Sequence, residues 1–476
     1  MKQIIADIHC HPTLKPYGNS FPGQAQDASP DNITSLYYYD RQTLWDKIKN
    51  RLAGLTNFRQ SDFTALKYGG VNLIISALYP LEKGFCRTKF GTGDIIDAGL
   101  NLVTGAGANR INFIQDVNNG YFNDLQTEYA FLLAFDGKEN IIDGQKVIYK
   151  LTSSLNDVLR SQEACPDDTY LIHVIPSFEG THSLYSNFND IGQDNDAVRS
   201  DVFNNLAAVK QWQYPPPFVT FAHHFYNGFC GHAHSLTDGV VKLFTNQAFM
   251  LGEPMNEFGR EVIRRLLDNT NGKRILIDVK HMSEKARTDY YNMLDSEYAE
   301  DDLPVIASHA AVRGNDANSG WFLDADINFS DTDIIRIGRS GGLFGIQLDK
   351  RRIASGAEIN GFENYIARRK VLYHAAELIW RQIEYVAELL DSNDLFAWAA
   401  ICIGSDNDGI VNPVDGIWTS EDFPAMEAYL LMHAYNYVTN DIQKLKNDIN
   451  KKIDAEEIID RFMGNNVYSF LQKNMP

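Results

Sequence analysis

Eight apolar, β-branched segments recur along the 476-residue chain, and each is followed by a polar or helical stretch. Uninterrupted apolar runs of this length are typical of strands that are buried on both faces, as in a parallel sheet. Repeated alternation of such strands with helices predicts an α/β fold, a (β/α)8 barrel of the TIM type. The expected strands are 4–10, 71–78, 169–177, 218–224, 274–281, 304–309, 342–348 and 399–405.

The chain is longer than a bare barrel, which needs about 250 residues. The largest excess lies between the second and third expected strands, at 80–168. Within it, the Gly-rich piece 91–107 and the paired stretch 140–152 suggest a subdomain or lid over one end of the barrel. The segment 420–476 is expected to form helices on the outside. We therefore predict a single barrel domain over 1–476 with one large insertion and C-terminal helices.

Composition narrows the class of protein. Acidic residues outnumber basic ones by 62 to 43, giving a formal charge of −19, which opposes binding to phosphate backbones. The sequence contains no apolar run of about 18 residues and starts without a signal-peptide core, so no membrane span is expected. Five scattered cysteines indicate a reducing compartment. We expect a cytoplasmic protein without nucleic-acid or membrane partners, and a homodimer is left open.

Histidines and carboxylates gather where the expected strands end. In a parallel barrel these ends meet at one mouth, where barrel enzymes build their active sites. Imidazoles and carboxylates bind borderline divalent ions such as Zn²⁺, and they also suit Mn²⁺ or Fe²⁺. A single strand-end histidine is more often a hydrogen-bonded core residue, so it is the joint pattern that predicts a metal site. The residues are His9, His11, Glu179, His223, His281, His309 and Asp406.

Several of these positions have plainer interpretations. Glu179 could cap a helix that follows it. Asp406 and Asp408 lie in the sequence GSDNDG, where aspartates also form turns. Strand alternation directs His224 and Lys280 away from the mouth, so we expect neither of them at the metal site.

The ordered motifs of the chain resemble those of a known enzyme family. The opening DIHCHP at 7–12 looks like the HxH motif of the amidohydrolase superfamily of metal-dependent hydrolases. The later motifs resemble, more narrowly, those of the membrane dipeptidase family, also called renal dipeptidase or peptidase family M19. These motifs are FEGTHSL (178–184), FVTFAHH (218–224), ILIDVKHMS (275–283), PVIASHA (304–310), IGSDNDG (403–409) and FMGNNVYSFL (462–471).

The resemblance implies a dipeptidase-like hydrolase that cleaves an amide bond, with dipeptides as substrates. It implies two divalent ions, Zn²⁺ being the expected metal, and a hydroxide that bridges them and attacks the carbonyl carbon. His223 would contact the substrate carbonyl, Asp406 would transfer protons, and Arg313 would hold the substrate carboxylate. The implied metal ligands are His9 and His11 for one ion, His281 and His309 for the other, and Glu179 as the bridge.

His11 departs from the family pattern, in which an aspartate usually occupies this position. The change makes the first metal site less anionic and more like sites of the wider superfamily, which leaves a deaminase or lactonase reaction open. One metal per chain favours a deaminase-like site, and two favour hydrolysis at a dinuclear centre. A non-catalytic, ligand-binding barrel is the alternative from another class. Asp406 argues against it, because a binding protein has no need of a proton shuttle.

Overall fold

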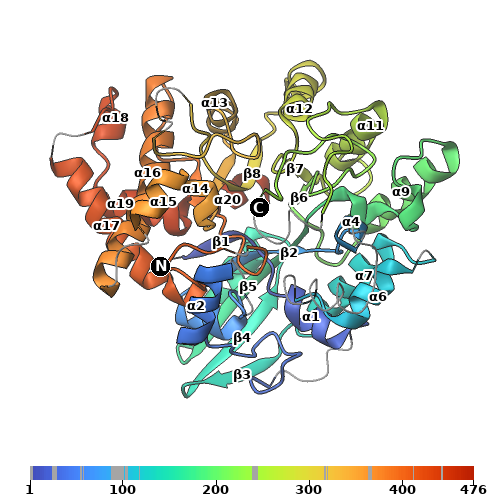
Figure 1. Ribbon diagram of the computed structural model, residues 1–476, viewed down its shortest axis with the longest axis horizontal. Coiled ribbons are helices and arrows are strands. Elements are labelled where there is room, and N and C mark those ends of the chain that lie inside the picture. The colour runs from blue at the N-terminus through green and yellow to red at the C-terminus, as the bar shows by residue number, and fades with distance from the viewer. Residues whose placement is uncertain are drawn as a thin grey trace.

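The computed structural model describes residues 4–475 except 24–28, 54–55, 57, 87–100, 102–104, 117, 238–244, 316–317, 319, 363–366, 411 and 441–442. Its central strands coincide with the eight segments expected from the sequence (Figure 1). Nearly all of their residues are buried, in agreement with their continuous apolar character. They are β1 (Ala6–Cys10), β2 (Leu73–Leu78), β5 (Thr169–Phe178), β6 (Phe218–Thr220), β7 (Leu276–Asp278), β8 (Ile306–Ala310), β9 (Leu343–Ile346) and β10 (Ile401–Ile403).

These strands are parallel and form the predicted barrel. Their order is β5-β2-β1-β10-β9-β8-β7-β6. The two outer members meet through a parallel bridge between Glu179 and Thr220, where the Gly180 amide donates to the Thr220 carbonyl at 2.9 Å. Because the pairing is parallel, the carboxyl ends of all eight strands lie at one mouth.

Helices surround the strands in Figure 1. Their starts follow local sequence: the Ser283 hydroxyl accepts from the Ala286 amide at the start of α12, and Ser330 and Asp333 form a capping box on α13. The helices between β5 and β10 are α9 (Asp196–Lys210), α11 (Glu257–Leu267), α12 (Glu284–Glu297), α13 (Asp331–Arg339), α14 (Lys350–Ile353), α15 (Gly356–Phe362) and α16 (Arg368–Ser392). Those before β2 are α1 (Leu14–Ser20), α2 (Leu44–Ala53) and α3 (Phe63–Tyr68).

The insertion 80–168 adds a hairpin to the sheet and several helices to the described structure. The hairpin of β3 (Glu139–Ile142) and β4 (Gln145–Leu151) extends the sheet, because β4 pairs with the first half of β5. This hairpin therefore lies at the end of the barrel opposite the mouth, at the lower edge of Figure 1. Most of the Gly-rich piece lies outside the described residues. The helices of the insertion are α4 (Lys83–Cys86), α6 (Ala108–Gln115), α7 (Tyr121–Leu133) and α8 (Leu155–Glu163).

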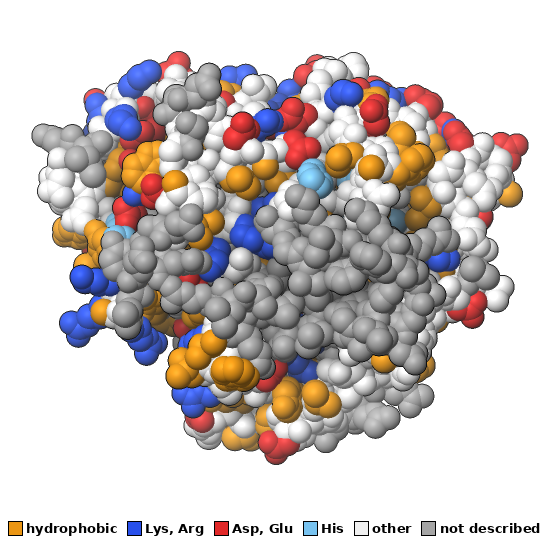
Figure 2. Space-filling model, viewed as in Figure 1, with side chains coloured by type: hydrophobic (Ala, Val, Ile, Leu, Met, Phe, Trp, Pro, Cys, Tyr) orange, Lys and Arg blue, Asp and Glu red, His pale blue; other side chains and the backbone are white. Residues whose placement is uncertain are grey.

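The last part of the chain is helical and packs on the barrel. The Asn466 side chain donates to the carbonyls of Trp398 and Ile401 at 2.7 and 2.8 Å, which ties the final helix to the start of β10. None of the described helices has the length and apolar character needed to cross a bilayer. Acidic, basic and hydrophobic side chains are interspersed on the described part of the face in Figure 2. The terminal helices are α17 (Phe423–Thr439), α18 (Asp448–Lys451), α19 (Ala455–Asp460) and α20 (Asn466–Asn474).

Candidate metal centre and active site

Glu179 lies at the centre of the histidines predicted from the sequence. It directly follows β5, and its side chain is almost completely buried. Both of its carboxylate oxygens face imidazole nitrogens, and each nitrogen lies 3.3 to 3.6 Å away. The nitrogens come from the ends of four strands around the mouth, β1, β6, β7 and β8. They are the Nε2 atoms of His9, His11, His223, His281 and His309.

Beneath this cluster, the hydroxyl of Ser308 holds two of the histidines. It lies 3.0 Å from Nδ1 of His9 and 2.9 Å from Nδ1 of His309. It also lies 2.6 Å from the buried carboxylate of Asp278. A hydroxyl has one proton and two lone pairs, so it donates to Asp278 and accepts from both imidazoles. This arrangement leaves the lone pairs of both Nε2 atoms directed at Glu179.

Two further histidines are oriented in the same way. Nδ1 of His11 donates to the Ala77 carbonyl at 2.8 Å. Nδ1 of His223 lies 2.7 Å from Glu82, a buried carboxylate of the insertion that also accepts from the Phe225 amide at 2.9 Å. Histidines that bind metal through one nitrogen usually have the other nitrogen held by such an acceptor.

The cluster retains buried polar atoms for which the described residues offer no hydrogen bond. These atoms include Nε2 of His9, Nε2 of His11 and Oε1 of Glu179. Buried polar groups are normally hydrogen-bonded, so such atoms require a ligand. Among the described residues, four triads have ligand atoms within 4.8 Å of one another, and two of these triads contain Glu179. His9 and His11 complete one of these two triads and His281 and His309 the other, and imidazoles with a carboxylate are a donor set that fits borderline divalent ions.

The electrostatics of the cluster favour a cation, and a bound metal ion would replace the proton of His11. Burial raises the pKa of Glu179, but the neighbouring His223 and His9 outweigh burial and hold that pKa well below its usual range. Burial lowers the pKa of His281 to about 3. Burial also lowers the pKa of His11, but its hydrogen bonds with Asp406 and Glu179 prevail and raise that pKa to about 10. Asp406 and Glu179 thus favour positive charge around His11, as a cation site requires.

Asp406 faces the same cluster from the turn after β10. Its Oδ1 lies 3.4 Å from Nε2 of His11 and 4.0 Å from Nε2 of His9. Its Oδ2 accepts from the Gln347 amide at 2.7 Å. The backbone of Asp406 has a φ of 59°, a left-handed conformation that is uncommon outside glycine and concentrates at functional sites.

Arg313, the predicted substrate-binding residue, is held by other partners. Its Nε donates to Asp324 at 2.7 Å, and its guanidinium also pairs with Glu284 at the start of α12. These contacts are partly exposed to solvent and involve neither Glu179 nor Asp406. The structure therefore brings together seven of the eight predicted site residues and leaves Arg313 apart from them.

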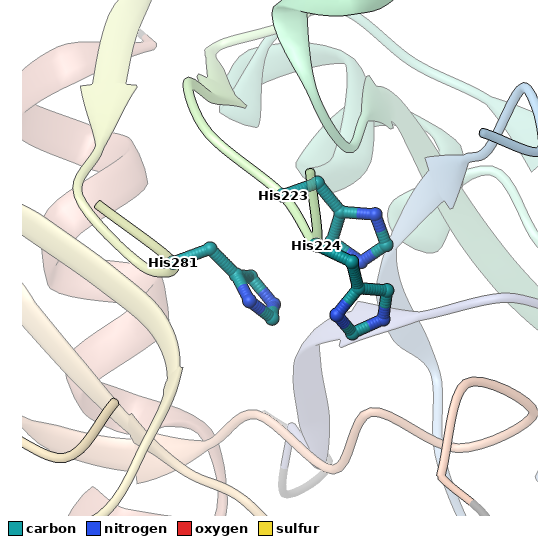
Figure 3. Close-up of side chains that lie close together, drawn as sticks. All are labelled: His223, His224 and His281. Carbon is teal, nitrogen blue, oxygen red and sulfur yellow. The ribbon is translucent and has the colours of Figure 1, made fainter. Parts of the chain in front are cut away.

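The expected orientations of His224 and Lys280 are wrong. The ring of His224 lies beside those of His223 and His281 (Figure 3), with ring centroids 3.8 and 5.1 Å away. Nζ of Lys280 lies 3.4 Å from the Gln347 side chain that binds Asp406. Strand alternation fails at both positions because β6 ends at Thr220 and β7 at Asp278, before these residues are reached.

The sequence interpretation also missed the residues that support the site. Glu82, Asp278, Ser308 and Gln347 were not among the predicted residues. Ser308 had a signal, since it directly precedes a predicted ligand within the SH pair at 308–309. Glu82 and Gln347 had none, because they reach the site through contacts between segments that are distant in the sequence.

Comparison with known proteins agrees with the fold. Residues 218–450 match the family described as membrane dipeptidase (peptidase family M19). Three residues of the cluster precede this match in the sequence but lie beside its histidines in the structure. They are His9, His11 and Glu179. No curated protein sequence is significantly similar to the chain.

Solved metallopeptidases share the fold over the whole chain. One is a dipeptidase of family M19, dipeptidase AC, with 15% identity, coverage of 100% of this chain and 99% of its own, and a TM-score of 0.51. Another, from Rhodobacter sphaeroides, carries a phosphinate mimic of the dipeptide L-Ala-D-Ala and has 15% identity, 99% coverage of both chains and a TM-score of 0.52. The probable dipeptidase PvdM from Pseudomonas aeruginosa has 13% identity, coverage of 99% and 96%, and a TM-score of 0.50.

These structural likenesses show the fold, and the sequence match to peptidase family M19 covers residues 218–450. Members of family M19 are metal-dependent, in keeping with the His/Glu triads at the barrel mouth. Residues 218–450 match the membrane dipeptidase family, peptidase family M19, and this match together with the shared fold supports a dipeptidase-type hydrolase.

Proposed function

We propose that this protein hydrolyses dipeptides at a centre of two divalent cations, with Zn²⁺ as the expected metal. The observation that carries the proposal is the position of Glu179. Both of its oxygens face histidine nitrogens, and one of them is buried without a hydrogen bond from the described residues. A carboxylate so placed can hold two ions about 3.5–4 Å apart.

In this proposal His9 and His11 would hold one ion, and His281 and His309 would hold the other. The charge of Glu179, the shared ligand, offsets part of the repulsion between the ions, which neutral imidazoles cannot do. When bound, such a pair of ions lowers the pKa of water and polarises a carbonyl group.

The chain itself supplies proton transfer and a hydrogen bond to the substrate. Oδ1 of Asp406 takes a proton from the attacking water and returns it to the leaving amine. Burial lowers the pKa of His223, but the charges of Glu179 and Glu82 prevail and raise that pKa. Its Nε2–H can therefore donate to the carbonyl oxygen of the substrate as negative charge develops there.

The choice of dipeptides rests on the family match and on a relative. The solved metallopeptidase from Rhodobacter sphaeroides was captured with a mimic of L-Ala-D-Ala. A D-residue at the second position is therefore a sensible part of the substrate range to test. Arg313 pairs with Glu284 and Asp324 at partly exposed positions, and its role in holding the substrate carboxylate stays a prediction.

A metal count combined with a dipeptide panel tests the proposal. The panel should pair each L,L-dipeptide with its L,D-counterpart and include a lactone and an amino-purine as probes of the alternative reactions. We expect two ions per chain and turnover of at least one dipeptide. Turnover of the lactone or the amine with no dipeptide hydrolysed would overturn the assignment.

A further inference from the structure

His224 brings a third imidazole to one side of the metal centre. It lies next to His223 and across from His281, and the three rings face a common space (Figure 3). One ligand nitrogen from each of the three lies within 4.8 Å of the others. This triad contains no carboxylate, whereas both triads assigned above contain Glu179.

The supporting contacts of His223 and His224 are those expected of metal ligands. Nδ1 of His223 lies 2.7 Å from the carboxylate of Glu82. Nδ1 of His224 lies 2.7 Å from the hydroxyl of Ser235, which also accepts from the Gln247 amide at 2.9 Å. A hydroxyl has two lone pairs and so can accept from both groups. With Nδ1 held in this way, each imidazole directs Nε2 at the common space, and His223 can bind a metal ion there once it releases its Nε2 proton.

His281 supplies the third side of this space. Its Nε2 faces Glu179 at 3.3 Å, and its Nδ1 is buried without a hydrogen bond from any described residue. The backbone of His281 has a φ of 64°, so the residue is held in a left-handed conformation that places its ring between the two groups of histidines. The ring of His281 lies 4.6 Å from that of His223 and 5.1 Å from that of His224.

We propose that His223, His224 and His281 form an additional cation site that binds Zn²⁺ at metal excess and inhibits the enzyme. Three imidazoles without a carboxylate suit Zn²⁺ or Cu²⁺ and not Mg²⁺. The site fills last, because it lies beside two other cations and because His281, whose Nε2 would hold one of them, must release its ring proton to water to bind a further ion through Nδ1. Once an ion occupies Nε2 of His223, that nitrogen can no longer donate to the substrate. The metal site stands on this geometry, whereas its inhibitory effect rests on the function proposed above.

Titration of the metal-loaded enzyme with Zn²⁺ alone tests the site. Bound metal is counted by equilibrium dialysis with elemental analysis, and dipeptide hydrolysis is followed in parallel. His224→Asn removes the third imidazole, and His234→Asn is the matched control, since His234 lies on a nearby loop outside the triad. We expect the wild type and His234→Asn to bind one more Zn²⁺ than His224→Asn does. Both should lose activity at least fivefold at metal excess, and His224→Asn should retain it.

A second variant guards against misfolding of the first. Ser235→Ala keeps His224 but removes the group that holds its Nδ1, and we expect it to weaken the additional Zn²⁺ by about tenfold. Excess Mg²⁺ should neither bind nor inhibit.

Equal Zn²⁺ counts in the wild type and His224→Asn would overturn the site. An extra ion that leaves hydrolysis unchanged would overturn its inhibitory effect. Should no protein in the series hydrolyse a dipeptide, the proposed function fails while the metal counts still decide whether the site exists.

Discussion

Two buried carboxylate clusters lie close together at the barrel mouth, and they are built differently. Asp408 accepts from the amide and hydroxyl of Ser61 at 2.8 and 2.6 Å, from the Gln60 amide at 3.1 Å, and from Lys15 at 2.9 Å. Its charge and its acceptor sites are thus met by the protein. Glu179 is equally buried, but its neighbours are imidazoles and its Oε1 accepts no hydrogen bond from the described residues. A saturated buried carboxylate stabilises the fold, and an unsaturated one marks a ligand site.

Asp406 and Asp408 bring this contrast into a single turn. Both residues have a positive φ, 59° and 69°, and both are nearly buried. One oxygen of Asp406 faces His11, whereas the carboxylate of Asp408 is held by Lys15 and Ser61. Substitutions in the two clusters should therefore have different consequences, metal binding and catalysis in one case and stability in the other.

The largest effect is expected from Glu179→Gln. The amide keeps the shape of the side chain but offers one good acceptor in place of two, so at least one ion should dissociate and activity should collapse. If Glu179 were only a helix cap, the substitution would cost about 1 kcal/mol or less of stability and leave the metal in place. Elemental analysis beside a melting curve separates the two outcomes, and full metal occupancy would contradict the bridging role.

Asp406→Asn should reduce kcat about a hundredfold or more while the metal content stays largely unchanged. The new amide can still form a hydrogen bond with the side chain of Gln347, either as acceptor or as donor, but it cannot take a proton. Steady-state kinetics on protein of known metal content measures the effect. A kcat close to that of the wild type would remove Asp406 from the mechanism.

Ser308→Ala should weaken metal binding about 10- to 100-fold, the usual result of losing a group that orients metal-binding histidines. Both ions should be affected, because the hydroxyl holds His9 and His309 at once. Competition with a chelator measures the affinity, and Ser308→Thr, which keeps a hydroxyl, serves as the control. Unchanged release of both ions would show that the hydroxyl has no such role.

Asp408→Asn should leave kcat per folded molecule and metal content unchanged but destabilise the protein. It breaks a buried ion pair with Lys15, which typically costs about 3–5 kcal/mol. Denaturant unfolding measures the loss, and Lys15→Met tests the other partner of the pair. Loss of metal from Asp408→Asn with normal stability would erase the distinction between the two clusters.

Much of the fold could be predicted because a buried parallel strand is a continuous apolar run, and eight such runs are visible in the sequence. The clustering of the histidines with Glu179 could be predicted because these residues lie at the ends of the runs. The ends of the strands could not, since apolar residues continue past them. The run 218–224 predicts one strand, but β6 ends at Thr220. The predicted orientation of the His224 side chain was wrong because strand alternation does not extend to this residue. Glu82 reaches His223 only because the insertion folds back to the mouth, a contact without a local sequence signal.

The central claim is that amide hydrolysis depends on metal held around Glu179. Removal of metal with a chelator, verified by elemental analysis and by unchanged circular dichroism, tests it most directly. We predict that dipeptide hydrolysis falls to background in the metal-free protein and returns as Zn²⁺ or Mn²⁺ is added back up to two equivalents. Undiminished hydrolysis by folded protein that contains no metal would contradict the account.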